Sequence, residues 1–258
     1  MSGFCVTDVS VVPGPVDMDK EETSEWKVAD WVAKQLERDF KKPFFLGCGF
    51  LRPHLPWYAP RSYFEKFPLD KIVLPEVNNN DWDDIPRLGK WMAQYSVHNE
   101  SGQTDHELVL KHDQWKHAVQ AYLATIHFVD ECLGRVLDAL EKSPYADNTI
   151  IVLWSDHGWH LGEKLHWRKF SLWEEGTRTV LLFSGNQIKA NRVCERPVNL
   201  IDIYPTLVDL CGLPQNPKLE GRSITPLSNF NWVRKCRTPS ISLIMNPTIP
   251  GLTCLIMG

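Results

Sequence analysis

The longest regular pattern in the chain is a helical repeat of apolar residues over positions 113–142. Apolar side chains recur there every three or four residues, which gives a helix a wide apolar stripe. The positions are Trp115, Val119, Tyr122, Ile126, Val129, Leu133, Val136 and Leu140. Similar spacing predicts a helix over 24–41 with Ser24 as its N-cap, and another over 199–214 that ends in Cys-Gly.

Between these helices, three short runs are apolar on both faces, as expected of strands inside a sheet. They cover residues 43–50, 148–154 and 179–185. Strands alternate with helices, so the predicted fold class is α/β, a mostly parallel sheet flanked by helices with 148–154 as a central strand. Residues 51–68 read as a Pro-rich loop with one helical turn near 61–66, and 69–112 as a long excursion with short helices.

Composition narrows the class of protein. The 258 residues carry a net charge of −4 and are 43% hydrophobic, which suits a core of ordinary size and gives no argument for a nucleic-acid surface. No apolar stretch is long enough for a membrane span, and the chain as written starts without a secretory signal. The seven cysteines form no CxxC pair, and Cys48 and Cys132 fall in apolar segments. We therefore expect buried free thiols.

Side chains with ligand and proton chemistry follow two of the strands. His54 comes after the first strand, and Asp156 and His157 come directly after the second. A short loop can then return Lys169 to the same place. Open α/β sheets bind ligands beyond the carboxyl ends of their strands. A carboxylate and an imidazole suit a metal ion, and nearby cations suit the charge of a tetrahedral anion.

Each of these residues also has a structural explanation. Asp156 can cap a helix, and His157 can be a hydrogen-bonded histidine at the rim. His54, between two prolines, can be structural, and Lys169 with Arg168 can be solvated charge. Four neighbours are expected on the loop surface or behind the ligands: His160, Glu163, Lys164 and His166. The tryptophans at 159, 167 and 173 have two equally plausible roles, packing at the lip of the site and stacking against a sugar.

Several blocks of the chain resemble the sulfatase family of the alkaline-phosphatase-like superfamily. The stretch "LWSDHGWHLGEKLHWRKFSLWEEGTR" is similar to the family's C-terminal signature, and "KPFFLGCGFLRPHLPWYAPRSYFEKFP" to a block of its iduronate-2-sulfatase group. "AYLATIHFVDECLGRVLDALE" resembles the family's long helix, and "NLIDIYPTLVDLCGLP" with "LEGRSITPL" a later segment. The resemblance covers residues 8 to 227, approximately.

The resemblance implies a mechanism and a set of roles. Sulfatases hydrolyse sulfate esters with a formylglycine, made from a cysteine in a C-x-P/A-S-R motif, and with a divalent metal, usually calcium. By position, Asp156 and His157 correspond to metal ligands and Lys169 to a lysine on the sulfate. His54 corresponds to a histidine near the ester oxygen. An Asp-His pair by itself suggests zinc or manganese, so the metal stays open. The implied substrate is a sulfated carbohydrate, such as a sulfated uronate, and relatives are usually exported.

The chain also departs from the family. None of its cysteines begins a C-x-P/A-S-R motif, and the family's N-terminal Asp-Asp metal pair is absent. We therefore expect residues 1–227 to be a partial sulfatase domain without its N-terminal part, and 228–258 to be a non-matching tail, frameshifted or disordered. One functional hypothesis is a sulfatase fragment that is inactive alone. Another is a non-catalytic remnant or binding module, and a weaker one is a phosphomonoester or phosphonate hydrolase of the same superfamily.

Overall fold

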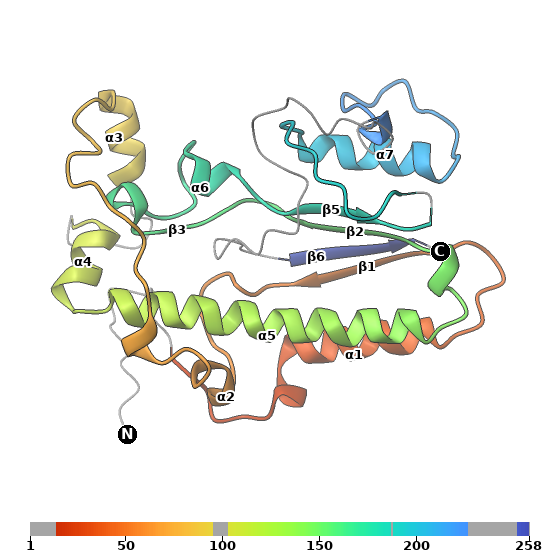
Figure 1. Cartoon of the computed structure of the whole chain (residues 1–258), viewed down its shortest axis with the longest axis horizontal. Coiled ribbons are helices and arrows are strands. Elements are labelled where there is room, and N and C mark those ends of the chain that lie inside the picture. The colour runs from red at the N-terminus through yellow and green to blue at the C-terminus, as the bar shows by residue number, and fades with distance from the viewer. Residues whose placement is uncertain (1–13, 95–102, 187, 227–251, 258) are drawn as a thin grey trace.

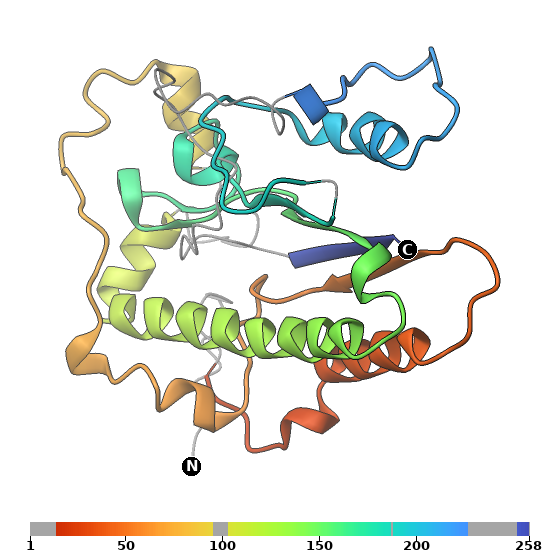
Figure 2. The same ribbon diagram turned by 45° about the vertical axis from the view of Figure 1, so that its right-hand side comes forward.

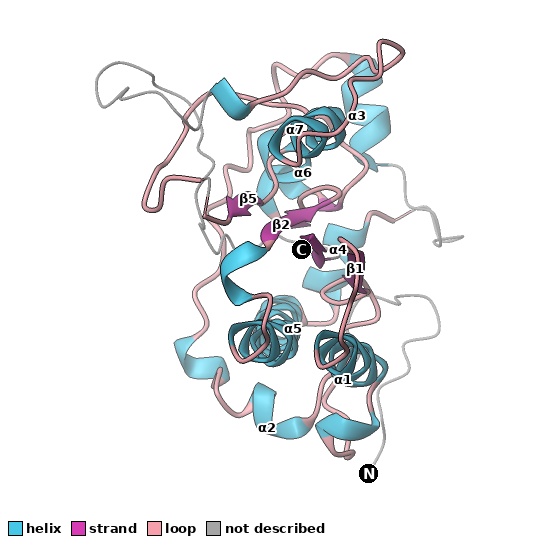
Figure 3. Cartoon of the chain, turned by 90° about the vertical axis from the view of Figure 1, so that its right-hand side faces the viewer, coloured by secondary structure: helices cyan, strands magenta, loops and turns pink. Residues whose placement is uncertain are grey.

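The computed structural model describes residues 14–94, 103–186, 188–226 and 252–257 of the chain. These residues form three layers, seen from the side in Figure 1 and from the end in Figure 3. A four-stranded sheet lies in the middle. Helices α1 (Ser24–Leu36) and α5 (Trp115–Glu141) cover one face of it, and α7 (Ile203–Leu210) lies over the other.

The remaining helices are short and lie mostly in the loops between strands. They are α2 (Arg61–Phe64), α3 (Arg87–Gln94), α4 (Asp105–Lys111) and α6 (Glu174–Thr177). In Figures 1 and 2, α3, α4 and α6 gather at one end of the sheet, around a hairpin of β3 (His160–Leu161) and β4 (Trp167–Arg168). The helical turn expected near 61–66 and the short helices expected within 69–112 are confirmed.

The central sheet has the order β1-β6-β2-β5. Its strands are β1 (Phe45–Phe50), β2 (Ile150–Ser155), β5 (Leu181–Ser184) and β6 (Leu252–Met257). β2 is an inner strand, so the central position predicted for 148–154 is confirmed. In the register, Cys254 of β6 pairs with Cys48 on one side and with Leu153 on the other.

The prediction of a mostly parallel sheet is wrong for the described strands, because every neighbouring pair is antiparallel. β1 and β2 do run in the same direction, which their long connection through α5 allows, but β6 lies between them in the opposite direction. β6 comes from the region expected to be a non-matching tail. β5 reverses because the chain returns from β2 by the hairpin and the four-residue helix α6, without a long crossover helix.

The boundaries of two predicted helices also move. Thr23, not Ser24, caps α1: its Oγ1 accepts a hydrogen bond from the backbone N–H of Trp26 at 3.3 Å. The helix ends at Leu36, five residues before the predicted end at 41. The helix predicted over 199–214 is α7 preceded by a 3-10 turn, and Gly212 follows it with φ +61°, as a C-terminal glycine does.

The main core lies between the two long helices and strands β1 and β2, and a smaller one lies between α7 and the opposite face of the sheet. Cys48 and Cys132 are buried in the main core and are free thiols, as predicted, whereas Cys211 is a free thiol that is exposed, so the expected burial is wrong there. Burial raises the pKa of the Cys48 and Cys132 thiols to about 12, so they stay protonated and inert at neutral pH. No helix in the described part of the chain is long and apolar enough to cross a membrane.

Candidate active site

The four candidate residues lie on two strand ends and one hairpin. Because β1 and β2 run in the same direction, the segments that follow them leave the same edge of the sheet. His54 follows β1, and Asp156 and His157 follow β2. The hairpin returns Lys169 to this edge, and its Nζ donates to His54 Nε2 at 3.0 Å. We call His54, Asp156, His157 and Lys169 the strand-end cluster.

The loop that carries His54 is anchored on both sides. Arg52 donates from Nε to the carbonyl of Tyr58 at 3.2 Å, and its Nη1 lies 3.4 Å from Oε1 of the buried Glu25 on α1. The indole N–H of Trp57 donates to the carbonyl of Pro53 at 2.7 Å. His54 Nδ1 lies 2.8 Å from the carbonyl of Leu55. Nδ1 therefore carries the ring proton, and Nε2 is left to accept from the Lys169 ammonium.

Asp156 and His157 present two neighbouring donor atoms to a cation. His157 Nδ1 lies 2.9 Å from the carbonyl of Gly158, which fixes the tautomer and leaves Nε2 with a lone pair. Nε2 is buried without a hydrogen-bond partner and lies 3.3 Å from Asp156 Oδ2. Burial lowers the pKa of His157, which favours the neutral imidazole that a metal needs.

This pair therefore fits a divalent cation in its chemistry, as one imidazole nitrogen and one carboxylate oxygen. It does not complete a coordination shell. Within the residues that the structure describes, no group of three or more His, Cys, Asp or Glu side chains is arranged to hold a metal ion. Any further ligands must come from water, from substrate or from residues outside the described part of the site.

The hairpin holds Lys169 by the two residues before it. Arg168, at φ 70°, places Nε 2.7 Å from Asp105 Oδ2 at the start of α4, and the indole N–H of Trp167 donates to His106 Nδ1 at 3.2 Å. The Lys169 ammonium lies 6.0 Å from the centre of the Trp159 ring. Partial burial lowers the pKa of Lys169, while the carboxylate of Asp156 acts against that shift.

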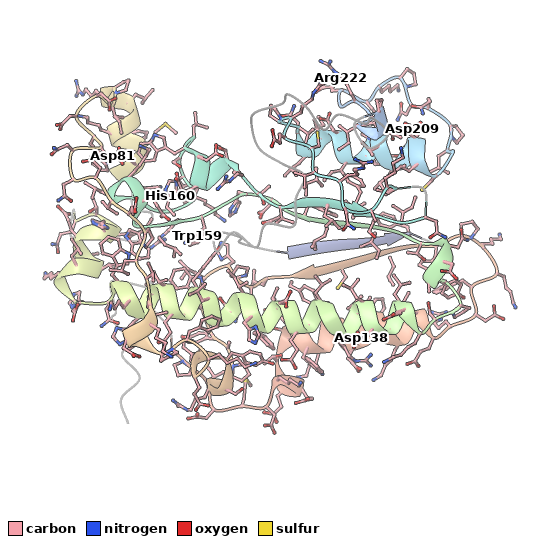
Figure 4. All side chains as sticks on the ribbon, in the orientation of Figure 1. Asp81, Asp138, Trp159, His160, Asp209 and Arg222 are labelled. Carbon is pink, nitrogen blue, oxygen red and sulfur yellow. The ribbon has the colours of Figure 1, made fainter. Side chains whose placement is uncertain are left out.

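The structure decides between alternatives for the neighbours of this cluster. His160 and His166 are buried, which favours a position behind the ligands over the loop surface. Arg168 is also buried and paired, so it is not solvated charge. Trp159 and Trp167 are packed in the core, which decides for packing and against sugar stacking at these two positions. Figure 4 labels Trp159 and His160, which lie between α5 and α6.

Sequence reasoning missed the residues that support the cluster: Glu25, Arg52, Asp105 and His106. One signal was present for the last two. "TDHE" is a capping box, in which Thr104 Oγ1 accepts from the N–H of Glu107 and the Glu107 carboxylate accepts from the N–H of Thr104. The box marks the start of a helix, but nothing in it shows that the hairpin lies against that start.

The arrangement can bind a tetrahedral anion between a cation and a lysine, with an imidazole beside it. The model of the family described as Sulfatase matches residues 6–213. The chain therefore belongs to the sulfatase family.

Individual relatives agree with this assignment. A sulfatase of Formosa agariphila is 41% identical over 205 residues, covering 80% of this chain and 39% of that protein. Iduronate 2-sulfatase of Mus musculus is 29% identical over 271 residues, covering 91% of this chain and 46% of that protein. The chain thus spans less than half the length of either relative.

The fold agrees as well. The phosphonate monoester hydrolase of Silicibacter pomeroyi superposes with a TM-score of 0.66 at 22% identity, covering 87% of this chain and 47% of that one. At this identity the likeness shows a shared fold alone.

Proposed function

We propose that the chain carries the anion-facing and metal-facing side of a sulfuric ester hydrolase site. The observation that carries the proposal is the 3.0 Å contact between the Lys169 ammonium and His54 Nε2, beside Asp156 and His157, in a member of the sulfatase family. The proposed ester belongs to a sulfated carbohydrate, such as a sulfated uronate. The similarity to iduronate 2-sulfatase supports this substrate class.

In this proposal Lys169 binds a sulfate oxygen and stabilises the negative charge that grows on the departing group. A sulfate held by Lys169 brings its ester oxygen near the imidazole of His54. Once the Lys169 ammonium turns to the sulfate, Nε2 of His54 is free to take up a proton from solvent, and it delivers that proton to the leaving alcohol. Because the carbonyl of Leu55 holds the proton on Nδ1, Nε2 is the atom that takes up and gives the proton.

Asp156 and His157 would hold a divalent cation through Oδ2 and Nε2. Such an ion would act as a Lewis acid that polarises a sulfate oxygen. The family favours calcium, and the nitrogen ligand is equally suited to zinc or manganese.

The nucleophile of the family has no counterpart in the 258 residues, since none of the seven cysteines begins a C-x-P/A-S-R motif. We therefore propose that sulfate esters are hydrolysed only by a protein that contains both these residues and the formylglycine motif. A non-catalytic remnant that only binds sulfate esters is the alternative for the chain alone. A phosphonate or phosphomonoester hydrolase is a further alternative, favoured by the likeness of fold to a phosphonate monoester hydrolase.

The test joins the chain to an N-terminal segment that carries the cysteine motif and coexpresses it with a formylglycine-generating enzyme. The extended protein should hydrolyse a sulfated uronate disaccharide and an aryl sulfate. His54→Ala should reduce turnover of the disaccharide more than that of the aryl sulfate, because a poor leaving alcohol needs the proton and a phenolate hardly does.

Equal losses on both substrates would remove His54 from the general-acid role. Faster turnover of a phosphonate monoester than of either sulfate would instead favour the phosphonate hydrolase. No turnover of any ester, with sulfate still bound, would favour the non-catalytic module.

A further inference from the structure

The segment after Lys169 is tied to a buried histidine. The backbone N–H of Ser171 donates to the carbonyl of Lys169 at 2.7 Å, and Ser171 Oγ lies 2.7 Å from His160 Nε2. His160 is 0% exposed. Two consecutive hydrogen bonds therefore connect the backbone of Lys169 to a side chain in the interior.

The surroundings leave the His160 ring little freedom to turn. The ring centres of His166 and Trp173 lie 4.8 and 5.8 Å from it, both at steep angles. Gly176 closes the other side: a Cβ there would lie 2.9 Å from Ser171 Oγ and 3.5 Å from His160 Nε2. The hydroxyl of Ser171 is thus held between the histidine and a backbone that has no room for a side chain.

The same segment supports the other half of the strand-end cluster. The N–H of Gly158, directly after His157, donates to the carbonyl of Gly176 at 2.9 Å. A Cβ at Gly158 would lie 2.0 Å from the carbonyl oxygen of Glu175. Residues 171–176 therefore contact both the backbone of Lys169 and Gly158, the residue after His157. A shift of this segment would change the positions of Lys169 and His157 together.

On the C-terminal side of Lys169, Ser171 is the inward contact. Phe170 and Leu172 are 46% and 83% exposed, so neither residue anchors the loop to the core. The anchors of Trp167 and Arg168 to α4 act on the N-terminal side of Lys169. On the C-terminal side, the position of the Lys169 ammonium therefore depends on the contacts of Ser171.

We propose that His160 is a positioning residue, which through Ser171 holds the Lys169 ammonium against His54 Nε2. The importance of this contact for sulfate rests on the proposed function. The contact itself is a property of the chain and is measured without a substrate.

The test uses a matched pair of substitutions in the full chain. Glutamine at position 160 places an amide nitrogen near the position of the histidine Nε2, and asparagine places one near Nδ1. His160→Gln thus keeps the bond to Ser171, whereas His160→Asn loses it at similar size and polarity. Ser171→Ala removes the hydroxyl directly. Thr206→Val is the control, since it deletes another buried hydroxyl, which accepts from the N–H of Ile224 at 3.0 Å, far from Lys169 in the sequence.

The readout is the ¹⁵N resonance of His54 Nε2, with Lys169→Met giving its value when the ammonium is absent. His160→Asn and Ser171→Ala should move the resonance toward the Lys169→Met value, while His160→Gln and Thr206→Val leave it in place. The proposal is overturned if Ser171→Ala leaves the resonance unchanged, or if the glutamine and asparagine variants shift it equally. If His160→Asn does not fold, Ser171→Ala decides alone.

A titration with inorganic sulfate separates this inference from the proposed function. His160→Asn and Ser171→Ala should weaken sulfate binding by roughly tenfold, the usual worth of a hydrogen bond to a charged group. Suppose that the wild-type chain binds no sulfate while the His54 resonance still moves as expected in His160→Asn and Ser171→Ala. That result would contradict the proposed function and leave the positioning role of His160 supported.

Discussion

Asp156 and His157 of the strand-end cluster directly precede the β3–β4 hairpin in the chain, and the histidines of the two regions have opposite surroundings. The side chain of His157, in the cluster, is 22% exposed, and its Nε2 faces Asp156 without a hydrogen-bond partner. His160, three residues later, is 0% exposed, and its Nε2 is bonded to Ser171. His157 thus keeps the lone pair of Nε2 available for a ligand, whereas the Nε2 of His160 is used in a hydrogen bond within the chain.

This difference suggests a division of labour that substitutions can test. The cluster should matter for chemistry and little for folding, because Asp156 is mostly exposed and His157 Nε2 has no hydrogen-bond partner among the described residues. The hairpin should matter for folding first, because its side chains fill the core. The expected effects range from a complete loss of turnover to almost no change in stability.

The largest expected effect is the loss of turnover that follows from the missing nucleophile. The chain as written should show no turnover of an aryl sulfate or a sulfated uronate disaccharide, with calcium, manganese or zinc added. In a hydrolase whose catalytic residues act as a unit, loss of the nucleophile costs roughly a factor of a million in turnover. Release of sulfate above the blank that disappears in Lys169→Ala would show that the cluster suffices, and would refute this prediction.

The next effect concerns the core of the hairpin. Trp167→Ala should lower the free energy of unfolding by about 3–5 kcal/mol, because it empties a packed site and leaves His106 Nδ1 without its donor. Trp31→Ala is the matched control, since Trp31 is 56% exposed and its loss should cost no more than about 0.5 kcal/mol. Urea unfolding measures both. Equal losses would mean that the hairpin is not part of the cooperative core.

A smaller effect should appear in the pH dependence of stability. Burial lowers the pKa of His160 to about 3, assisted by His166 and Lys164 and opposed by the nearby backbone of Glu163. The Glu175 carboxylate lies 4.0 Å from Nδ1. The unfolded chain, with a His pKa near 6.5, binds this proton first, so stability falls as the pH drops from about 6.5 toward 3, by up to about 1.4 kcal/mol per pH unit.

His160→Gln removes this proton while keeping the contact with Ser171. The difference in unfolding free energy between wild type and His160→Gln should therefore shrink or change sign as the pH falls through that window. A difference that stays constant from pH 7 to pH 4 would show that His160 is not held neutral.

The sequence predicted the elements that bring the cluster together, since β1, β2 and α5 follow directly from apolar runs and helical spacing. Strand pairing was not predictable in the same way. β6 pairs between β1 and β2 although it lies about 200 residues away from the first and about 100 from the second, and local periodicity carries no information about such a partner.

The same limit applies to the site. The strand ends place His54, Asp156 and His157 at one edge because β1 and β2 run in the same direction. The fate of His160 depended on contacts with Ser171 and Trp173, which a short-range pattern does not reveal. A histidine in a charged stretch looks the same in the sequence whether it faces a ligand or the core.

The smallest expected effect is that of Asp156 on stability. Its side chain is 67% exposed, and its Oδ1 accepts the backbone N–H of His157 at 3.1 Å. Asp156→Ala should therefore change the free energy of unfolding by no more than about 0.5 kcal/mol. Asp156→Asn is the matched variant, because its amide oxygen keeps the acceptor and loses the charge. Both substitutions should weaken the binding of a divalent cation in a calorimetric titration, since a carboxylate is a better ligand than an amide for such an ion. A loss above about 2 kcal/mol in the alanine variant would assign Asp156 to the fold. An unchanged cation affinity in both variants would show that Asp156 is not a metal ligand. The contrast between a chemical cluster and a structural hairpin would then not account for Asp156.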